Sequence, residues 1–436
     1  MSSFFYHTFP SGLRLVYRHA PSPVAYAGIM VGAGTRDEKT EINGMAHYIE
    51  HCVFKGTLTR KGGHFVPRSS SQIIHRLEDI GAEVNAYTTK EETVFYAATP
   101  THFLQRTLHL LLDLVRRPTF PKDETDKEKS VILDEIESYN DSPSELIYDD
   151  FESLLFDAHP LALPILGTRQ SLRHISRSPK MPLKFMRQYY RTDRMVVFVQ
   201  SRMPFARVRT ILEHLVEEDA STYSVPSMLT SQNEMDEQVS LRSERLPFSP
   251  SDQSPRTVAF RRHTHQLHLM VGQRAYPLGH KMQLPLYLLN NIIGGGAMSS
   301  RLNMSLREQK GLVYTVESQY TPLSDTGYWN VYLACDPEDK QQCLDLVFKE
   351  LDELITAPLS HSQLAQSLRQ LRGQMAIGAE NNENNVLAMA KQMLYFNQAY
   401  TWQQSFAHLH TITPDILQTV AQEIFCPDRL FILSYE

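Results

Sequence analysis

The chain has 436 residues, of which 42% are hydrophobic and 21% are charged, a balance typical of a globular protein. This length exceeds what one ordinary hydrophobic core holds and indicates two sizeable domains. The formal net charge of -6 gives no overall basic field, so charge does not favour a nucleic-acid-binding protein.

The cysteines and the N-terminal residues bear on the compartment. The four cysteines are far apart and form no CxxC pair, which favours buried free thiols in a reducing compartment. Residues 1–10 contain no basic segment followed by an apolar run, so we expect no secretory signal. No segment is apolar over a length that crosses a bilayer, so we expect no membrane contact. The expected location is the cytoplasm; a periplasmic or organellar protein with a removed leader is the alternative.

Two halves of the chain contain similar elements in the same order. In the first half, hydrophobic patterning predicts a leucine-rich helix at 102–115 and strands at 13–17, 25–31, 84–88, 93–98 and 194–199. In the second half, it predicts a helix at 338–355 and strands at 257–260, 267–272, 313–316, 327–334 and 429–433. The segment between the halves is rich in Ser, Pro, Gln and Glu and is expected to be a linker.

The repeated order predicts an α+β fold with two structurally duplicated domains, each a mostly antiparallel sheet packed with helices. The predicted boundaries are 1–222 for the first domain, 223–256 for the linker and 257–436 for the second domain.

The first domain contains an H-x-x-E-H motif formed by His47, Glu50 and His51. On a helix these three positions share one face, so two imidazoles can bind Zn²⁺ while the carboxylate reaches a bound water. The apolar residues that flank the motif fit a helix buried on its other sides. A helix with two paired histidines and no metal is the alternative, so a further signal is needed.

A catalytic zinc site needs a third protein ligand, and the helix predicted from residue 122 to about residue 139 offers candidates. At 100° per residue, Glu128, Ile132 and Glu135 lie along one stripe of this helix. A carboxylate on an apolar stripe is costly unless it is paired or bound to a metal. Glu135 is therefore the predicted third ligand and Glu128 a supporting residue; a solvated acidic face is the alternative.

Taken together, these motifs resemble the pitrilysin-type metallopeptidases, which include insulin-degrading enzymes and mitochondrial processing peptidases. In that family, H-x-x-E-H is followed by E-x(6)-E, which Glu128 and Glu135 match. The resemblance implies one Zn²⁺ per chain in the first domain, with Glu50 as catalytic base, and no zinc in the second domain. Residues 61–70 look like an insertion close to the motif and are a candidate for substrate selection.

The resemblance also implies substrate contacts. Asn85, Ala86 and Tyr87 match an edge strand that pairs with the peptide backbone. Arg307 and Tyr314 look like the family's arginine and tyrosine pair, which holds substrate near the metal, with Tyr314 as an oxyanion donor. A surface arginine and a tyrosine packed in the core are the alternative.

The expected function is that of a zinc metalloendopeptidase that hydrolyses short or unfolded peptides in a closed chamber, with Glu50 activating a zinc-bound water. A catalytically silent structural or peptide-binding subunit of a larger complex is the alternative. Single-chain family members contain four such domains, so this chain is expected to form a homodimer or to pair with a second pitrilysin-like subunit. In a homodimer, Arg307 and Tyr314 would serve the zinc site of the partner chain.

Overall fold

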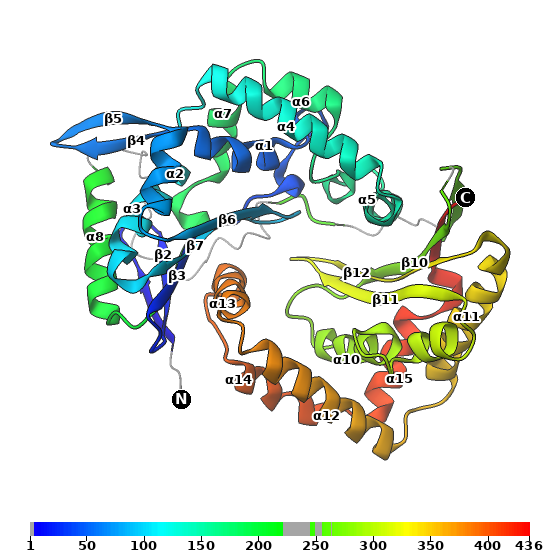
Figure 1. Cartoon of the computed structure of the whole chain (residues 1–436). Helices are drawn as coiled ribbons and strands as arrows, with labels where there is room; N and C mark the ends of the chain where they lie inside the picture. Colours follow the sequence, from blue (N-terminus) through cyan, green and yellow to red (C-terminus); the bar gives the residue numbers. More distant parts are fainter. Residues whose placement is uncertain (1–3, 221–244, 249–254, 263) are drawn as a thin grey trace. The chain divides into compact units, whose positions relative to one another are not determined.

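The computed structural model describes residues 4–220, 245–248, 255–262 and 264–436 (Figure 1). These residues form two compact units. Unit 1 contains the described parts of Met1–Ile136, Leu163–Arg245 and Ala379–Thr401. Unit 2 contains the described parts of Glu137–Ala162, Leu246–Gly378 and Trp402–Glu436.

A six-stranded sheet forms the centre of unit 1. Its strand order is β1 (Phe4–Thr8), β2 (Arg14–His19), β8 (Met195–Ser201), β3 (Val24–Val31), β7 (Thr93–Pro100) and β6 (Glu83–Thr88). Neighbouring strands are antiparallel except β2 and β8, which are parallel. The last strand, β6, lies at one edge of the sheet.

Helices cover both faces of this sheet, because side chains on both faces are apolar. On one face, alternate residues such as Leu15 and Ile29 pack against α1 (Met45–Cys52), α3 (Leu104–Arg116), α7 (Lys180–Tyr189) and α8 (Phe205–Ala220). On the other face, Val16, Met30 and Phe198 pack against α13 (Asn382–Phe396). Burial on both faces explains why these strands are nearly continuous apolar runs instead of alternating apolar and polar residues.

Unit 2 has a five-stranded sheet that also has helices packed on both faces. Its strand order is β11 (Val313–Pro322), β12 (Gly327–Cys335), β10 (Leu267–Ala275), β13 (Phe431–Tyr435) and β9 (Thr257–Phe260). Only the β13–β9 pair is parallel. The helices on the main core side are α10 (Gln283–Gly294), α11 (Lys340–Thr356), α12 (His361–Gly378) and α15 (Pro414–Ile424). On the other side, α5 (Pro143–Phe156) packs against Met270 and Leu433.

The predicted α+β class with two similar sheet-and-helix halves is confirmed. The observed units, however, are not the continuous segments 1–222 and 257–436, because each half of the chain gives one helix to the other unit. Helix α5 covers the second apolar face of the unit 2 sheet, and α13 covers that of the unit 1 sheet. The predicted linker, 223–256, lies largely outside the described residues; of its described part, Arg245 belongs to unit 1 and Leu246 begins unit 2.

The predicted insertion, 61–70, covers the turn and second strand of a hairpin of β4 (Gly56–Lys61) and β5 (His64–Ser69). It ends at the first residue of α2 (Ser70–Glu78). Gly62 and Gly63 connect the strands at φ +58° and +86°. Two successive positive φ angles are typical of a type I′ turn, which glycine adopts without steric cost.

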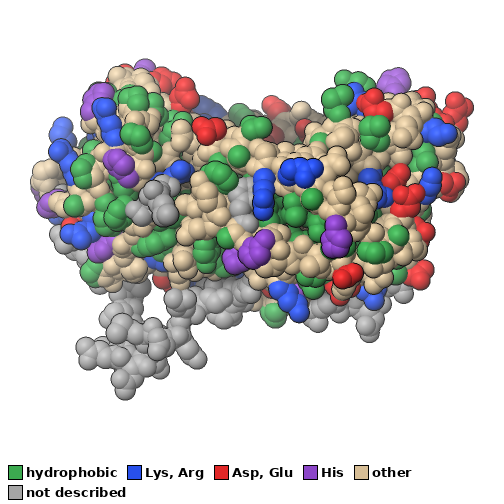
Figure 2. Space-filling model, turned by 90° about the horizontal axis from the view of Figure 1, so that it is seen from below, with side chains coloured by type: hydrophobic (Ala, Val, Ile, Leu, Met, Phe, Trp, Pro, Cys, Tyr) green, Lys and Arg blue, Asp and Glu red, His purple; other side chains and the backbone are tan. Residues whose placement is uncertain are grey.

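The remaining described α-helices are α4 (Lys122–Asn140), α6 (Arg169–Ile175) and α14 (Trp402–Ala407). Across the described ranges, no helix has both the length and the apolar character to span a membrane. On the face seen in Figure 2, acidic and basic side chains are spread among hydrophobic and other residues.

Candidate metal centre

Helix α1 carries the H-x-x-E-H motif, and its start is fixed by Gly44 and Glu38. Gly44 has a φ of +85°, and a Cβ there would lie 2.7 Å from the carbonyl oxygen of Leu166. The Glu38 carboxylate accepts hydrogen bonds from the backbone N–H groups of Gly44 and Ala46, both at 2.7 Å. It also accepts one at 3.0 Å from the Asn43 amide. A buried carboxylate thus satisfies the free N–H groups at the positive end of the helix.

Three side chains from α1 and α4 converge as the spacing predicts. Nε2 of His47 and Nε2 of His51 lie 3.7 and 3.6 Å from Oε2 of Glu135. One ligand atom from each residue lies within 4.8 Å of the other two. Ligands bound to tetrahedral Zn²⁺ at about 2.0–2.1 Å lie about 3.4 Å apart. The two nitrogens and one oxygen therefore fit a zinc ion, and Glu135, whose side chain is 43% exposed, leaves the centre accessible.

His47 has the protonation state, and His51 the orientation, that metal binding needs. Burial, and then the neighbouring His51, lower the pKa of His47 to about 3, so its imidazole is neutral at pH 7. On the other ring, Nδ1 of His51 is 2.9 Å from Oε1 of Glu128, which leaves Nε2 directed at Glu135. Lys55 forms an ion pair with the second oxygen of Glu128 at 2.5 Å. Such a carboxylate behind a ligating histidine fixes the ring and raises its basicity.

Glu50 lies beside this cluster without contributing an atom to it. The hydroxyl of Thr88, the last residue of β6, donates a hydrogen bond to Oε2 of Glu50 at 2.7 Å. Burial raises the pKa of Glu50, and the Thr88 hydrogen bond opposes that shift. Glu50 is thus held at the edge of the cluster, where it can exchange a proton with a bound water or substrate.

Comparisons with known proteins show the family of this chain. The family model described as insulinase (peptidase family M16) matches residues 14–169, and that of the peptidase M16 inactive domain matches residues 182–371. The chain belongs to peptidase family M16, the pitrilysin-type peptidases.

Relatives named as peptidases match nearly the whole chain. The uncharacterized zinc protease YmxG of Bacillus subtilis is 28% identical, over 98% of this chain and 97% of its own length. The mitochondrial-processing peptidase subunit beta of Bos taurus is 25% identical, over 94% of this chain and 79% of its own length. A protease from Helicobacter pylori has the same fold, with a TM-score of 0.84 at 18% identity and full coverage of both chains.

The residues predicted to bind the substrate backbone lie on the edge strand of this M16 peptidase. Asn85, Ala86 and Tyr87 pair with β7 on one side, and none of the described strands pairs with the other side of β6. Asn85 is exposed, and Tyr87 packs against Tyr96 with 6.3 Å between the ring centroids.

The predicted arginine and tyrosine pair lies in unit 2. The Arg307 guanidinium is 5.5 Å from the centre of the Tyr314 ring, and Tyr314 is 80% exposed. Tyr314 is therefore not a core residue, and both side chains are accessible to a ligand. Their contribution to a zinc site stays a prediction.

Sequence reasoning missed Glu38, Lys55 and Thr88. Lys55 follows His51 by four residues, so helical spacing could have placed it beside the same acidic stripe. Thr88 is the last residue of the predicted substrate strand, but the sequence did not indicate its contact with Glu50. No local pattern marks Glu38, because it reaches the start of α1 from outside that helix.

If Glu135 is the third ligand, Glu135→Gln should remove most of the bound zinc, because a neutral amide is a much weaker ligand than a carboxylate. Glu137→Gln, the same change two residues further along α4, should leave the metal content of the parent protein. Metal analysis of both purified variants tests this, and equal zinc in Glu135→Gln and parent protein would disprove the assignment.

Proposed function

We propose that this M16 peptidase is a zinc-dependent endopeptidase that binds one Zn²⁺ per chain through His47, His51 and Glu135. The observation that carries the proposal is the convergence of the His47 and His51 imidazoles and the Glu135 carboxylate on one point, with Glu50 beside them. The zinc protease names of several relatives support the choice of metal.

When bound, zinc supplies a Lewis acid that polarises the scissile carbonyl and lowers the pKa of water. Glu50 acts as general base: one carboxylate oxygen takes a proton from the attacking water and returns it to the leaving amide nitrogen. Thr88 holds Oε2 of Glu50 and restricts its rotation. Arg307 and Tyr314 contact the substrate, and the Tyr314 hydroxyl donates to the carbonyl oxygen as negative charge develops there.

The substrate class follows from the free edge of β6. A peptide added there pairs through main-chain hydrogen bonds, which bind many sequences as long as the chain is extended. Short or unfolded peptides meet that condition, and folded proteins do not. A closed chamber around the site would enforce the same limit.

Glu50→Gln tests the role of Glu50 directly. This variant should keep one zinc per chain and still bind peptide, yet its turnover of a quenched fluorescent peptide should fall by several orders of magnitude. Glu41→Gln, an equivalent change at an exposed position, should behave like the parent. Residual activity above about a tenth of the parent in Glu50→Gln would contradict the mechanism. If the unaltered protein binds peptide but does not cleave it, the silent-subunit alternative holds.

We also propose a homodimer in which Arg307 and Tyr314 act at the zinc site of the partner chain. Glu50→Gln and Tyr314→Phe should each be nearly inactive alone. After subunit exchange in a one-to-one mixture, about a quarter of the parental activity should return, because half of the dimers carry one intact site.

A control mixture identifies the source of any recovery. Glu50→Gln mixed with the Glu50→Gln, Tyr314→Phe double variant should regain nothing, since neither chain has a base. A monomer by sedimentation at the assay concentration, or no recovery in the first mixture despite demonstrated exchange, would rule out the shared site.

A further inference from the structure

Arg245 comes from the segment predicted as a linker, yet its side chain is buried in unit 1 and only 2% exposed. Its guanidinium donates to Oδ2 of Asp37 at 3.0 Å and to the carbonyl oxygen of Glu91 at 2.6 Å. It also forms an ion pair with the Glu91 carboxylate at 3.2 Å. One side chain therefore bridges two segments that are far apart in sequence.

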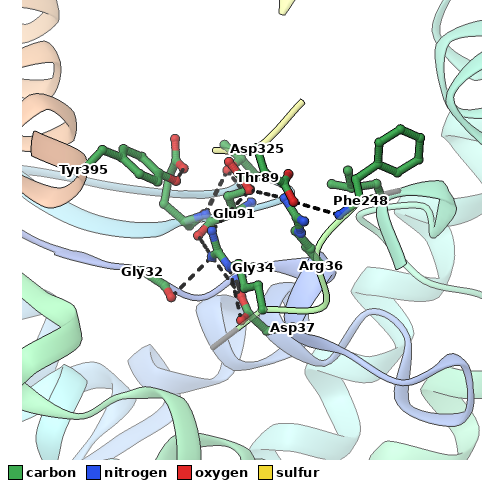
Figure 3. Close-up of polar contacts among 12 residues, drawn as sticks. Gly32, Gly34, Arg36, Asp37, Thr89, Glu91, Phe248, Asp325 and Tyr395 are labelled. Atoms are coloured by element: carbon green, nitrogen blue, oxygen red, sulfur yellow. Dashed lines mark hydrogen bonds and ion pairs between the residues drawn. The ribbon is translucent and has the colours of Figure 1, made fainter. Parts of the chain in front are cut away.

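Two more buried arginines, Arg194 and Arg36, complete this network. Figure 3 shows Arg36 together with Asp37 and Glu91. Arg194 pairs with Asp37 at 2.9 Å, and Arg36 pairs with Glu91 at 2.8 Å. Each carboxylate thus has an arginine partner from unit 1 besides Arg245. Asp37 and Glu91 would therefore each have a cationic partner without Arg245. Arg245 adds a bridge between the two carboxylates.

Asp37 and Glu91 each lie close in sequence to a residue that holds part of the metal centre in place. Asp37 precedes Glu38, whose carboxylate caps the helix that carries His47, Glu50 and His51. Glu91 lies in the turn that follows β6, whose last residue, Thr88, holds Glu50. The turn is itself tied down, because the N–H of Thr89 donates to the carbonyl oxygen of Glu92 at 2.8 Å. A shift at Asp37 would reach Glu38 through one residue of backbone, and a shift at Glu91 would reach Thr88 through three.

We infer that Arg245 is a positioning residue for the metal centre, acting through Glu38 and Thr88 without touching metal or substrate. This inference rests on the proposed zinc peptidase function. It assigns the linker a role in the site: the segment that joins the two halves also sets the geometry of His47, Glu50 and His51. Loss of residues behind a metal ligand commonly weakens metal binding by about 10–100-fold, and small displacements of catalytic groups reduce turnover further.

Arg245→Met removes the charge and the hydrogen bonds while keeping much of the side-chain length. Its affinity for Zn²⁺, measured by competition with a chromophoric chelator, should fall by about 10–100-fold. The visible spectrum of the Co²⁺-substituted protein should change, since that spectrum reports ligand geometry. The turnover number kcat should fall by a larger factor than KM rises, because Thr88 holds Glu50 while Asn85, Ala86 and Tyr87 keep their pairing with β7.

Phe248→Ala is the matched control, because Phe248 is a linker residue anchored in unit 2. Its ring centroid lies 5.4 Å from those of both Phe156 and His159. Phe248→Ala should keep the parental zinc affinity and cobalt spectrum even if its thermal midpoint falls. Arg245→Lys, which keeps the charge without the planar fork, should lie between parent and Arg245→Met.

Parental zinc affinity and cobalt spectrum in Arg245→Met, or equal losses in Phe248→Ala, would overturn the inference while leaving the peptidase proposal intact. If Arg245→Met does not fold, parental zinc affinity in Arg245→Lys would overturn it instead. A parent protein that binds no zinc would refute the proposed function and the inference together.

Discussion

The hydrogen bonds from the start of α1 to the Glu38 carboxylate determine where the functional side chains lie. Helix α1 is short, and both histidines and Glu50 are on it, so a rotation of this helix would move all three together. Two backbone N–H groups and the Asn43 amide fix its first turn to one buried carboxylate. Gly44 permits the close approach of residues 166 and 167 at the same point. The metal centre therefore depends on a cap that contains none of its own ligands.

Helix α4 provides the acidic side chains of the centre, and the helical period puts them on the same face. Glu128 and Glu135 are seven residues apart, two helical turns, so one reaches the second ring nitrogen of His51 while the other faces both Nε2 atoms. Lys55 pairs with the second oxygen of Glu128, which holds that carboxylate in place behind the histidine. The sheet adds the third support through Thr88. Helix, helix and edge strand thus each hold a different functional group, which gives the site the rigidity that catalysis requires.

Local spacing in the sequence was enough to predict much of this arrangement. The i, i+3, i+4 pattern placed His47, Glu50 and His51 on one face, and the apolar stripe of α4 singled out Glu128 and Glu135 among the seven acidic residues of that helix. Alternating and continuous apolar runs predicted every strand of the second sheet and all of the first except β1. The position of β6 at an edge came from the resemblance to the pitrilysin-type peptidases. The α+β class and the duplication followed from the order of those runs.

What the sequence did not reveal depends on contacts between distant segments. Glu38 and Arg245 are polar residues in irregular segments, and only the folded chain brings them to the start of α1 and to Asp37 and Glu91. The exchange of α5 and α13 is equally invisible to local patterns, because an amphipathic helix does not indicate which sheet it covers. The predicted boundaries at 222 and 257 therefore took each half of the chain as continuous.

Zinc titration of chelator-stripped protein tests the central claim most directly. Peptide hydrolysis should be absent without metal, rise in proportion to added Zn²⁺ and stop rising at one equivalent per chain. The same protein with His47 and His51 both replaced by Gln should stay inactive at every zinc concentration. Hydrolysis by the metal-free protein, or parental activity in the double variant, would contradict the assignment of His47, His51 and Glu135 as the catalytic metal site.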